Sequence, residues 1–428
     1  MQKIQNIVFA VLACVMLFSV VGSRAIFIAT NHKAPDSSEL ERRSYQKLGG
    51  VVRASFFDGE AQDLFEQYVA DGVPGRDQVL LLNASLQRQG IETAAMLVGD
   101  DLYPTFFGSS VVAVRDKQLL VTRSNSAPSA NSKELKSFLK TMNKAAKKHP
   151  DIRFSSRFTL EVRQSELNPT YALVSGDKFD SDWVQANIID ELDPALHAEV
   201  DPIESFQEIE NDWFSTDPHW TLERALRTYD SVAEQLGLSP APQGDYIQVI
   251  PAWQGSNARV GLDSRFTSTL WDLPIDFGNL HYYTIENDVL SEKERSDPGY
   301  RKKTLASQNA QMELANPYQG YGIYYGAFNG LIVNEGENNG KTCLIIGDSF
   351  THCLKRFIAA NYKETYSILP GNYATDLSLE KMIDKYKPDD VIYLTQAKKY
   401  NSFAVKSPKF IGMKSKDVDK SALEDADL

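Results

Sequence analysis

The C-terminal part of the chain constrains the fold most, because short apolar segments alternate there with helical patterns. Residues 343–346 form a wholly apolar run, typical of a strand buried on both faces of a sheet. Helices are predicted just after Ser349 and over 377–387, and strands over 365–369 and 391–394. A strand–helix–strand–helix–strand order predicts parallel strands joined by right-handed crossovers. We therefore expect an α/β protein with a parallel central sheet.

Upstream of this region the periodicity predicts further helices. One begins near Ser132, and a second is capped by Thr221 and ended by Gly237. A shorter helical face spans 61–69. Alternating or β-rich stretches predict strands over the remaining segments, namely 111–114, 119–122, 157–162 and 171–174.

The N-terminus carries an apolar segment that predicts an address outside the cytoplasm. Residues 7–22 and 25–29 are apolar, with Lys3 before them and Arg24 between them. Together they have the length of a membrane span if Arg24 lies near the interface. We expect an uncleaved, single-pass signal anchor, with a cleaved signal peptide or a buried N-terminal helix as the alternatives. Either signal places the rest of the chain outside the cytoplasm, at the membrane or secreted.

Length and charge bound the organisation of the chain. It has 428 residues, a formal net charge of −12 and a pI near 5.1. An acidic balance of this size argues against a nucleic-acid binder, which presents a basic face. The expected division is an anchor or signal peptide over 1–30, one domain over 31–403 and a polar tail over 404–428.

The three cysteines do not form a metal-binding pattern. Cys14 lies in the apolar N-terminal segment, and Cys343 and Cys353 flank the turn discussed next. The last two are expected to be free thiols, although their spacing also allows a bridge. Since no CxxC pair or Cys/His cluster is present in the sequence, we expect neither a metal nor another cofactor.

The first chemical signal is the turn Gly347-Asp348-Ser349, which ends the buried strand and opens a helix. Ligands of such sheets bind outside the carboxyl ends of the strands. A serine at this place exposes its hydroxyl, and its amide can stabilise an oxyanion. Gly347 allows the tight turn, and Asp348 is expected to cap the helix. The same tripeptide also occurs as a plain capped turn.

The second signal is Asp217-Pro218-His219, just before the helix that starts at Thr221. In an extended segment, which Pro218 favours for the residue before it, the side chains of residues 217 and 219 point the same way. Asp217 then orients the ring of His219, whose other nitrogen takes the proton of Ser349. The alternative is a capped helix entry with a polar histidine.

The pairing of D-x-H-W-T at 217–221 with G-D-S-F at 347–350 resembles the AlgX/AlgJ group of alginate O-acetyltransferases and the related DHHW family of envelope proteins. Residues 68–77 and 325–334 are similar to two further segments of these families. The resemblance implies an SGNH-hydrolase-like three-layer α/β fold with the Asp-His segment before the serine. It also implies Ser349 as nucleophile, His219 as general base and Asp217 as its orienter.

The resemblance also suggests residues around the oxyanion and the substrate. Asn372 and Tyr373 stand where the families often have an Arg-Tyr pair, so an asparagine amide replaces the arginine. Tyr325 and Asn334 come from the stretch that precedes the serine strand. Gly347 completes this set of candidates.

Three functions are compatible with these motifs and this resemblance. The first is transfer of acetyl groups to an envelope or extracellular polysaccharide, supplied with acetyl groups by a membrane-bound O-acyltransferase partner. The second is a carbohydrate acetylesterase, with water as the acceptor. The third is a non-catalytic scaffold of the same fold that binds polysaccharide or a membrane acyltransferase.

Several other residues have an ordinary interpretation beside a functional one. His352 is an alternative base or a histidine on the helix surface. Aromatic and histidine side chains of the central region either line a sugar groove or pack in the core, namely Trp253, Trp271, His281, Tyr282 and Tyr283.

Overall fold

A computed structural model describes residues 36–38, 40–41, 43–54, 59–73, 75–114, 119–275, 277, 279–295, 321 and 328–414. The predicted anchor over 1–30 lies outside these residues. Among the described helices, none is both long and apolar enough to cross a membrane. The chain divides into two compact units, residues up to 110 with 259–265, and residues 111–258 with 266 onward, where the sequence predicted one domain over 31–403.

The smaller unit is built mainly from helices around a buried carboxylate. Asp71 is 6 % exposed and accepts hydrogen bonds from Arg43 Nη1 and the Gln46 amide, both at 2.8 Å. Asp71 lies in the segment 68–77 that the sequence singled out, so this segment has a structural role here. The elements of the unit are β1 (Ser37–Ser38), β2 (Arg43–Ser44), α2 (Leu48–Arg53), α3 (Glu60–Asp71), α4 (Arg76–Val98) and β3 (Leu102–Pro104).

The larger unit is a mixed α/β fold around an eight-stranded sheet. The strands follow the order β11 (Val289–Arg295), β10 (Leu280–Glu286), β12 (Gly330–Asn334), β14 (Glu364–Ile368), β13 (Thr342–Gly347), β15 (Asp390–Gln396), β6 (Arg153–Thr159) and β7 (Ala198–Val200). The run from β14 to β7 is parallel, as the sequence predicted. The other three strands are antiparallel, so the sheet is mixed rather than wholly parallel.

The antiparallel edge has a physical cause in its connections. The loop 335–341 between β12 and β13 is too short for a crossover, which takes a dozen or more residues, so β12 runs opposite to its neighbour β14. Asn287 and Asp288 join β10 to β11 with positive φ angles of 49° and 63°. Positive φ at both central residues is what a tight hairpin turn with the right twist requires.

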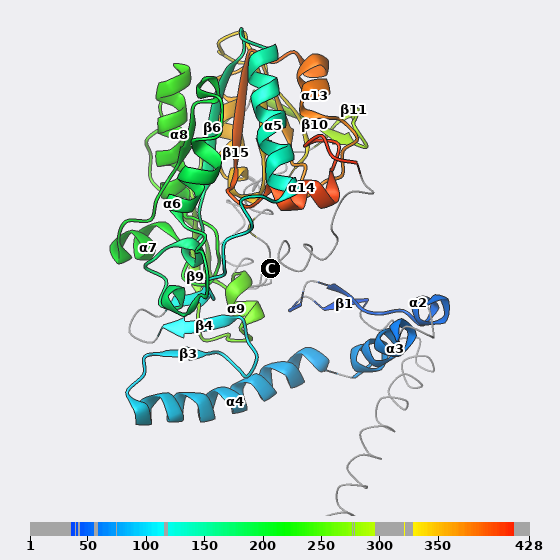
Figure 1. Ribbon diagram of the computed structural model, residues 1–428, viewed down its shortest axis with the longest axis vertical. Coiled ribbons are helices and arrows are strands. Elements are labelled where there is room, and N and C mark those ends of the chain that lie inside the picture. The colour runs from blue at the N-terminus through cyan, green and yellow to red at the C-terminus, as the bar shows by residue number, and fades with distance from the viewer. Residues whose placement is uncertain are drawn as a thin grey trace, which may run out of the picture. The chain divides into compact units, whose positions relative to one another are not determined.

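Helices cover both faces of the sheet, with α8 (Leu222–Leu236) on one side and α5 (Lys133–Lys148), α13 (Leu379–Tyr386) and α14 (Tyr400–Lys406) on the other (Figure 1). The side chains of β6 alternate accordingly. Phe154 and Phe158 join the apolar core on the α5 side, whereas Ser155 Oγ donates to Gln235 of α8 at 2.6 Å. The sheet therefore has an apolar face and a more polar one.

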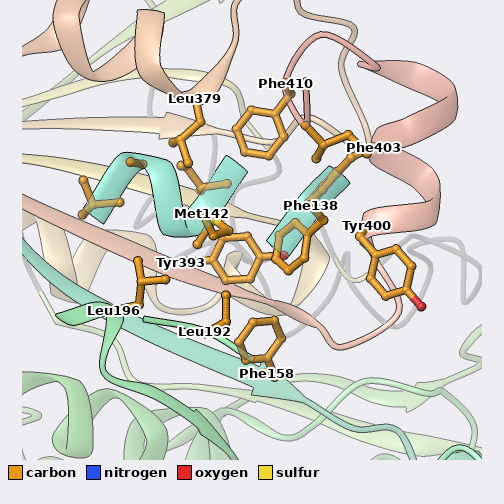
Figure 2. Close-up of a cluster of buried hydrophobic side chains, with 14 of the residues drawn as sticks. Phe138, Met142, Phe158, Leu192, Leu196, Leu379, Tyr393, Tyr400, Phe403 and Phe410 are labelled. Carbon is orange, nitrogen blue, oxygen red and sulfur yellow. The ribbon is translucent and has the colours of Figure 1, made fainter. Parts of the chain in front are cut away.

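Aromatic packing fills the core on the α5 face, as Figure 2 shows. Phe138 of α5 stacks on Tyr400 at 5.9 Å between ring centroids and lies 5.6 Å from Tyr393 of β15. Phe410 and Ile411 are 1 % and 0 % exposed in the same core. The polar tail predicted from residue 404 therefore begins later, because burial of these apolar side chains holds the chain on the core as far as Met413.

Most local sequence signals are confirmed. Ser132 caps α5 by accepting from the Leu135 amide, Thr221 caps α8 by accepting from the Arg224 amide, and Gly237 ends α8 with a left-handed conformation. The strand predicted over 171–174 is wrong, since these residues form a 3-10 turn, Tyr171–Leu173. Shorter elements of the larger unit are β4 (Val111–Val114), β5 (Leu119–Thr122), α6 (Ser181–Val184), α7 (Phe206–Asp212), β8 (Ile247–Trp253), β9 (Ser268–Asp272) and α12 (Lys355–Ala359). Helix α9 (Ser256–Val260) begins in this unit, and its last two residues belong to the smaller one.

Candidate active site

Ser349 lies at the carboxyl end of β13, in the turn that leads to a 3-10 helix, Ser349–Thr351. Asp348 is fully buried and holds this turn. Its Oδ1 accepts from the Phe350 amide at 3.0 Å, and its Oδ2 accepts from the Gln396 amide at the end of β15 at 2.8 Å. Asp348 thus caps the turn, as predicted, and ties it to the neighbouring strand.

Gly347 is required by a close approach inside the same turn. A side chain on this residue would collide with Thr351, whose Oγ1 lies 2.6 Å from the place where a Cβ would stand. Thr351 is itself fixed, because its hydroxyl donates to the Asp348 carbonyl at 2.7 Å. Thr351 therefore occupies the space that a second glycine leaves open in other nucleophile turns.

The amide of Ser349 is placed to serve an oxyanion. The amides of Phe350, Thr351 and His352 all donate within the turn, to Asp348 Oδ1, the Asp348 carbonyl and the Ser349 carbonyl. Within the described part of the chain, the Ser349 amide has no such acceptor. A donor left available beside the hydroxyl of its own residue is the geometry that stabilises an oxyanion.

Asp217 and His219 occupy the tip of a hairpin, not the extended segment that the sequence predicted. The Phe214 amide donates to the His219 carbonyl at 3.2 Å, and the Asp217 amide donates to the Phe214 carbonyl at 3.3 Å. Trp213 and Trp220 face each other across the base of the hairpin. The two side chains meet because an aspartate turn forms here, with the His219 amide donating to Asp217 Oδ1 at 3.1 Å.

The hairpin brings His219 against Ser349, which lies 130 residues further along the chain. His219 Nε2 lies 2.7 Å from Ser349 Oγ, and its Nδ1 lies 2.5 Å from Asp217 Oδ1. These distances are those of strong hydrogen bonds. The three residues thus form one continuous Ser–His–Asp chain, with the histidine between the hydroxyl and the carboxylate.

Two residues that were not predicted from the sequence, Gly255 and Ser256, contact Asp217. Ser256 donates to Asp217 Oδ2 with its amide at 2.7 Å and with its hydroxyl at 2.9 Å. Gly255 packs so closely that a Cβ there would lie 2.5 Å from the Thr216 carbonyl oxygen and 2.8 Å from Asp217 Oδ2. Each carboxylate oxygen of Asp217 therefore accepts two hydrogen bonds, from His219 on one side and from Ser256 on the other.

The pKa of Asp217 lies below its usual value despite complete burial. Burial acts to raise it, but the charge and hydrogen bond of His219 and the amides of Ser256 and His219 lower it further than burial raises it. Asp217 is 2 % exposed, so little water competes for its oxygens. A carboxylate that stays ionised is suited to hold His219 and to stabilise its protonated form.

Two aromatic rings pack against His219. Tyr321 stacks on the imidazole with ring centroids 4.3 Å apart, and Phe350 lies 4.9 Å away on a tilted plane. Trp220 is buried and its Nε1 donates to the Phe350 carbonyl at 3.2 Å. This bond ties the hairpin directly to the turn of Ser349.

His352 is buried, not on the helix surface as the sequence suggested. It is 5 % exposed, and burial lowers its pKa well below the usual value, with the charges of Lys355, His219 and Lys399 adding to the effect. The hydrogen bond to Ser349 comes from His219, so the alternative of His352 as the base finds no support.

One predicted site residue is not brought to Ser349. Asn334 lies at the opposite end of the sheet, where its Nδ2 donates to the Ala360 carbonyl at 2.8 Å beside the start of β14. The prediction was wrong because β12 runs antiparallel. Asn372 and Tyr373 are exposed, and no hydrogen bond in the described residues links them to Ser349. Tyr325 lies outside the described residues.

The cysteines are buried, and the aromatic candidates differ in their exposure. Cys343 and Cys353 are both buried free thiols, so the bridge is absent. Burial raises the pKa of Cys353 to about 11, and the Tyr321 hydroxyl donates to its sulfur at 3.1 Å. Trp253 and Tyr282 pack in the interior, whereas Trp271 is 44 % exposed. The described residues hold no cluster of three or more His, Cys, Asp or Glu suited to a metal ion.

The geometry defines a mixed α/β protein with a Ser–His–Asp hydrogen-bond chain at the carboxyl edge of its sheet. No family model and no curated protein matches the sequence. Solved structures similar to this chain include a DHHW family protein from Eubacterium siraeum, 14 % identical, covering 70 % of this chain and 92 % of that one with a TM-score of 0.48.

Two further solved structures are similar to this chain. Bacillus cereus PatB1 is 15 % identical, over 66 % of this chain and 95 % of its own, with a TM-score of 0.47. The O-acetyltransferase domain of Pseudomonas putida AlgJ is 12 % identical, over 74 % of this chain and 98 % of its own, with a TM-score of 0.33. The neighbours thus include the DHHW family and AlgJ, the groups that the two sequence motifs resemble.

Proposed function

We propose that the protein is a serine O-acetyltransferase that acts on a cell-envelope or extracellular polysaccharide through an acetyl-Ser349 intermediate. The observation that carries the proposal is the 2.7 Å contact between His219 Nε2 and Ser349 Oγ, with Asp217 bonded to the other ring nitrogen. A base in hydrogen-bond reach of a hydroxyl, itself oriented by a third group, is the arrangement that activates a serine.

In the first half-reaction, Ser349 Oγ attacks the carbonyl carbon of an acetyl ester while His219 takes the hydroxyl proton. The buried carboxylate of Asp217 stabilises the imidazolium that results, and the Ser349 amide donates to the carbonyl oxygen as it becomes negative. The tetrahedral intermediate then expels the leaving alkoxide, which receives the proton from His219. The products are acetyl-Ser349 and the free alcohol of the donor.

In the second half-reaction, a sugar hydroxyl gives its proton to His219 and attacks the acetyl carbonyl. Collapse of the intermediate forms the sugar acetate, and the proton returns to Ser349 Oγ. Water in place of the sugar would give an acetylesterase by the same steps, which is the second candidate. The partial exposure of Ser349 permits either acceptor to approach.

We propose further that the larger unit has an SGNH-hydrolase-like fold. The hairpin of Asp217 and His219 precedes the serine in the chain, and helices lie on both faces of the sheet, as in an SGNH-hydrolase-like three-layer fold. The apolar N-terminal segment would hold the enzyme outside the cytoplasm, where a membrane-bound O-acyltransferase would supply the acetyl groups. A third candidate, a non-catalytic scaffold of the same fold, predicts no acyl-enzyme.

The test is pre-steady-state release of nitrophenol from nitrophenyl acetate by the full chain, with and without oligosaccharide. We expect a burst close to one equivalent and an acetyl group on the peptide that contains Ser349, found by mass spectrometry. Ser349→Ala should abolish both, and His219→Gln should lower the rate by about 10³–10⁴-fold or more. The matched control Ser291→Ala, on the edge strand β11, should leave the burst unchanged.

The acceptor decides between the candidates. Oligosaccharide that accelerates turnover and emerges acetylated supports the transferase, whereas turnover to free acetate at the same rate with and without sugar supports the esterase. A folded wild-type chain with no burst and no acetyl-serine would overturn the catalytic proposal and favour the scaffold.

A further inference from the structure

A cavity lies beside the hairpin that carries Asp217 and His219. It has a volume of about 510 Å³, within the range of sites for small molecules. The first leg of the hairpin, residues 213–215, and the start of α8, residues 221–223, line it. Strand β9 and Tyr246 close the remainder of the wall.

Aromatic side chains give the cavity a flat apolar lining. Trp271 is 44 % exposed and Tyr246 is 39 % exposed, while Trp213 and Phe214, which also line the cavity, are 4 % and 5 % exposed. A single exposed aromatic residue is ordinary, but two that open into one cavity form a surface for a ligand. Amphipathic rings of this kind suit a ligand with an apolar face and polar edges, such as a sugar ring.

Polar groups around these rings can bind hydroxyl groups and select by charge. Hydroxyls come from Ser215, Ser268 and Thr269, and carboxylates come from Glu210 and Glu223. Of the described residues that line the cavity, none is Lys, Arg or His. The pKa of the Tyr246 phenol is raised, first by burial and then by the charge of Glu223, which lines the same cavity. An anionic ligand would meet repulsion here, and a neutral or cationic one would not.

Two arginines of α8 lie near this lining, and both face carboxylates. Arg227 acts on the pKa of Tyr246 but forms an ion pair with Asp212. The guanidinium of Arg224 lies 5.5 Å from the centre of the Trp213 ring and is paired with Asp201 and Glu208. The charged side chains within the cavity lining are thus the two glutamates, on a chain whose net charge is −12.

Hydrogen bonds connect the cavity wall to the proposed catalytic residues. Ser268 Oγ lies 3.0 Å from Ser215 Oγ and 2.8 Å from Thr216 Oγ1, and it accepts from the Thr216 amide at 3.2 Å. Thr216 Oγ1 in turn accepts from the Gly255 amide at 3.2 Å, next to Ser256, which binds Asp217. A ligand in the cavity therefore contacts the same hairpin that holds His219.

We propose that this cavity is a saccharide subsite that binds a sugar ring without a negative charge, stacked on Trp271 and hydrogen-bonded by the carboxylates and hydroxyls around it. Its role as an acceptor subsite rests on the proposed function, whereas the binding itself does not. The substrate class is then a glycan of neutral or amino sugars, and polymers of uronic acids are excluded from this cavity.

The binding test uses full-length Ser349→Ala, in which no turnover interferes. Three β-1,4-linked oligosaccharides are titrated by calorimetry: cello-oligosaccharide as the neutral probe, chitosan oligosaccharide as the cationic probe and oligouronate as the anionic probe. We expect one or both of the first two to bind and to protect Trp271 from acrylamide quenching, with oligouronate at least tenfold weaker. Tighter binding of oligouronate, or no binding of any probe, would overturn the proposal.

Variants locate the binding. Trp271→Ala should weaken the dissociation constant of the bound probe about tenfold or more, since a stacked ring contributes in this range. Trp271→Tyr should restore part of the loss. Glu223→Gln replaces a charged acceptor with a neutral one, so it should weaken the neutral probe only a few-fold and reduce the discrimination against oligouronate. The control Phe107→Ala removes a ring that is 73 % exposed outside the cavity, and it should change nothing. Binding that is indifferent to Trp271→Ala would overturn the assignment.

The outcomes for the two proposals can be separated. If no saccharide binds but wild-type protein gives the burst, the subsite proposal is wrong and the acyl-enzyme proposal is supported. Binding that depends on Trp271, together with no burst, would confirm a saccharide site on a chain that is not an acetyltransferase.

Discussion

Ser256 holds Asp217 with two donors at once, its amide at 2.7 Å and its hydroxyl at 2.9 Å from the same carboxylate oxygen. The hydroxyl is the part that a side-chain change can remove. Ser256 is thus a positioning residue, which acts on His219 only through the carboxylate.

Ser256→Ala is expected to lower kcat about tenfold with little change in KM, because a hydrogen bond to a charged group is worth about 1.5–3 kcal/mol. Loss of the donor also raises the pKa of Asp217, so the acid limb of the pH–rate profile should move to higher pH. Ser256→Thr should recover most of the rate. An unchanged kcat and pH profile in a folded Ser256→Ala variant would contradict the positioning role.

Gly255→Ala should be far more damaging than its size suggests. The new methyl would stand 2.5 Å from the Thr216 carbonyl oxygen and 2.8 Å from Asp217 Oδ2, so the carboxylate has to move. We expect at least a hundredfold loss of activity, since misplacement of reacting groups by about 1 Å costs that much. The matched control is Gly90→Ala in helix α4, where nothing lies within 4 Å of the new methyl. Equal activity of the two variants would refute the steric argument.

Lys355 should make stability depend on pH in the neutral to alkaline range. It is 3 % exposed, and burial lowers its pKa to about 7, while its Nζ donates to the Phe328 carbonyl at 2.9 Å. In the unfolded chain a lysine holds its proton up to about pH 10.4. Between these two values the unfolded state binds more protons, so the free energy of unfolding rises with pH.

Lys355→Met removes this dependence. Denaturant unfolding at about pH 6 and about pH 9 should show that the substitution is more favourable at the lower pH, by a few kcal/mol in relative free energy. The comparison between wild type and variant at each pH cancels the titration of other groups. A difference that is the same at both pH values would show that Lys355 keeps an ordinary pKa.

Asp390 should matter for stability and not for catalysis. It is fully buried at the start of β15, where Arg153 Nε lies 2.6 Å from Oδ1 and the Tyr362 hydroxyl donates to Oδ2 at 2.7 Å. Asp390→Ala is expected to lower the free energy of unfolding by about 1–3 kcal/mol, because the buried Tyr362 hydroxyl loses its acceptor, whereas Arg153 is 42 % exposed and can be hydrated. At a temperature where the variant is folded, its kcat should match wild type. A selective loss of kcat without loss of stability would contradict this separation.

The catalytic candidates were accessible to sequence reasoning because each depends on local chemistry. Ser349 follows an apolar strand, and Asp217 and His219 lie two residues apart beside a capped helix. The direction of the strand that precedes the serine strand could not be predicted from these local signals. Asn334 was assigned to the site because it precedes the serine strand, but β12 runs antiparallel and places it at the far end of the sheet.

Other features gave no signal that periodicity can detect. The sequence around Gly255 and Ser256 is typical of an ordinary loop. Their role comes only from contact with Asp217, which precedes Ser256 by 39 residues in the chain. Helix α4 was missed because its apolar residues do not form one stripe, with Leu82 and Leu86 exposed and Ile91 buried. Burial of Phe410 came from packing against α14, which the polar composition of the tail concealed.

The indole of Trp220 joins two loops that are remote in the chain, through its bond to the Phe350 carbonyl and its edge-to-face packing at 5.1 Å on the Phe350 ring. The contact between Trp220 and Phe350 helps to set the distance between His219 and Ser349. A substitution at position 220 or 350 therefore changes what the other position must provide. Among homologues, positions 220 and 350 are expected to covary: a smaller ring at one should be accompanied by a bulkier neighbour at the other, even where the histidine and the serine never change.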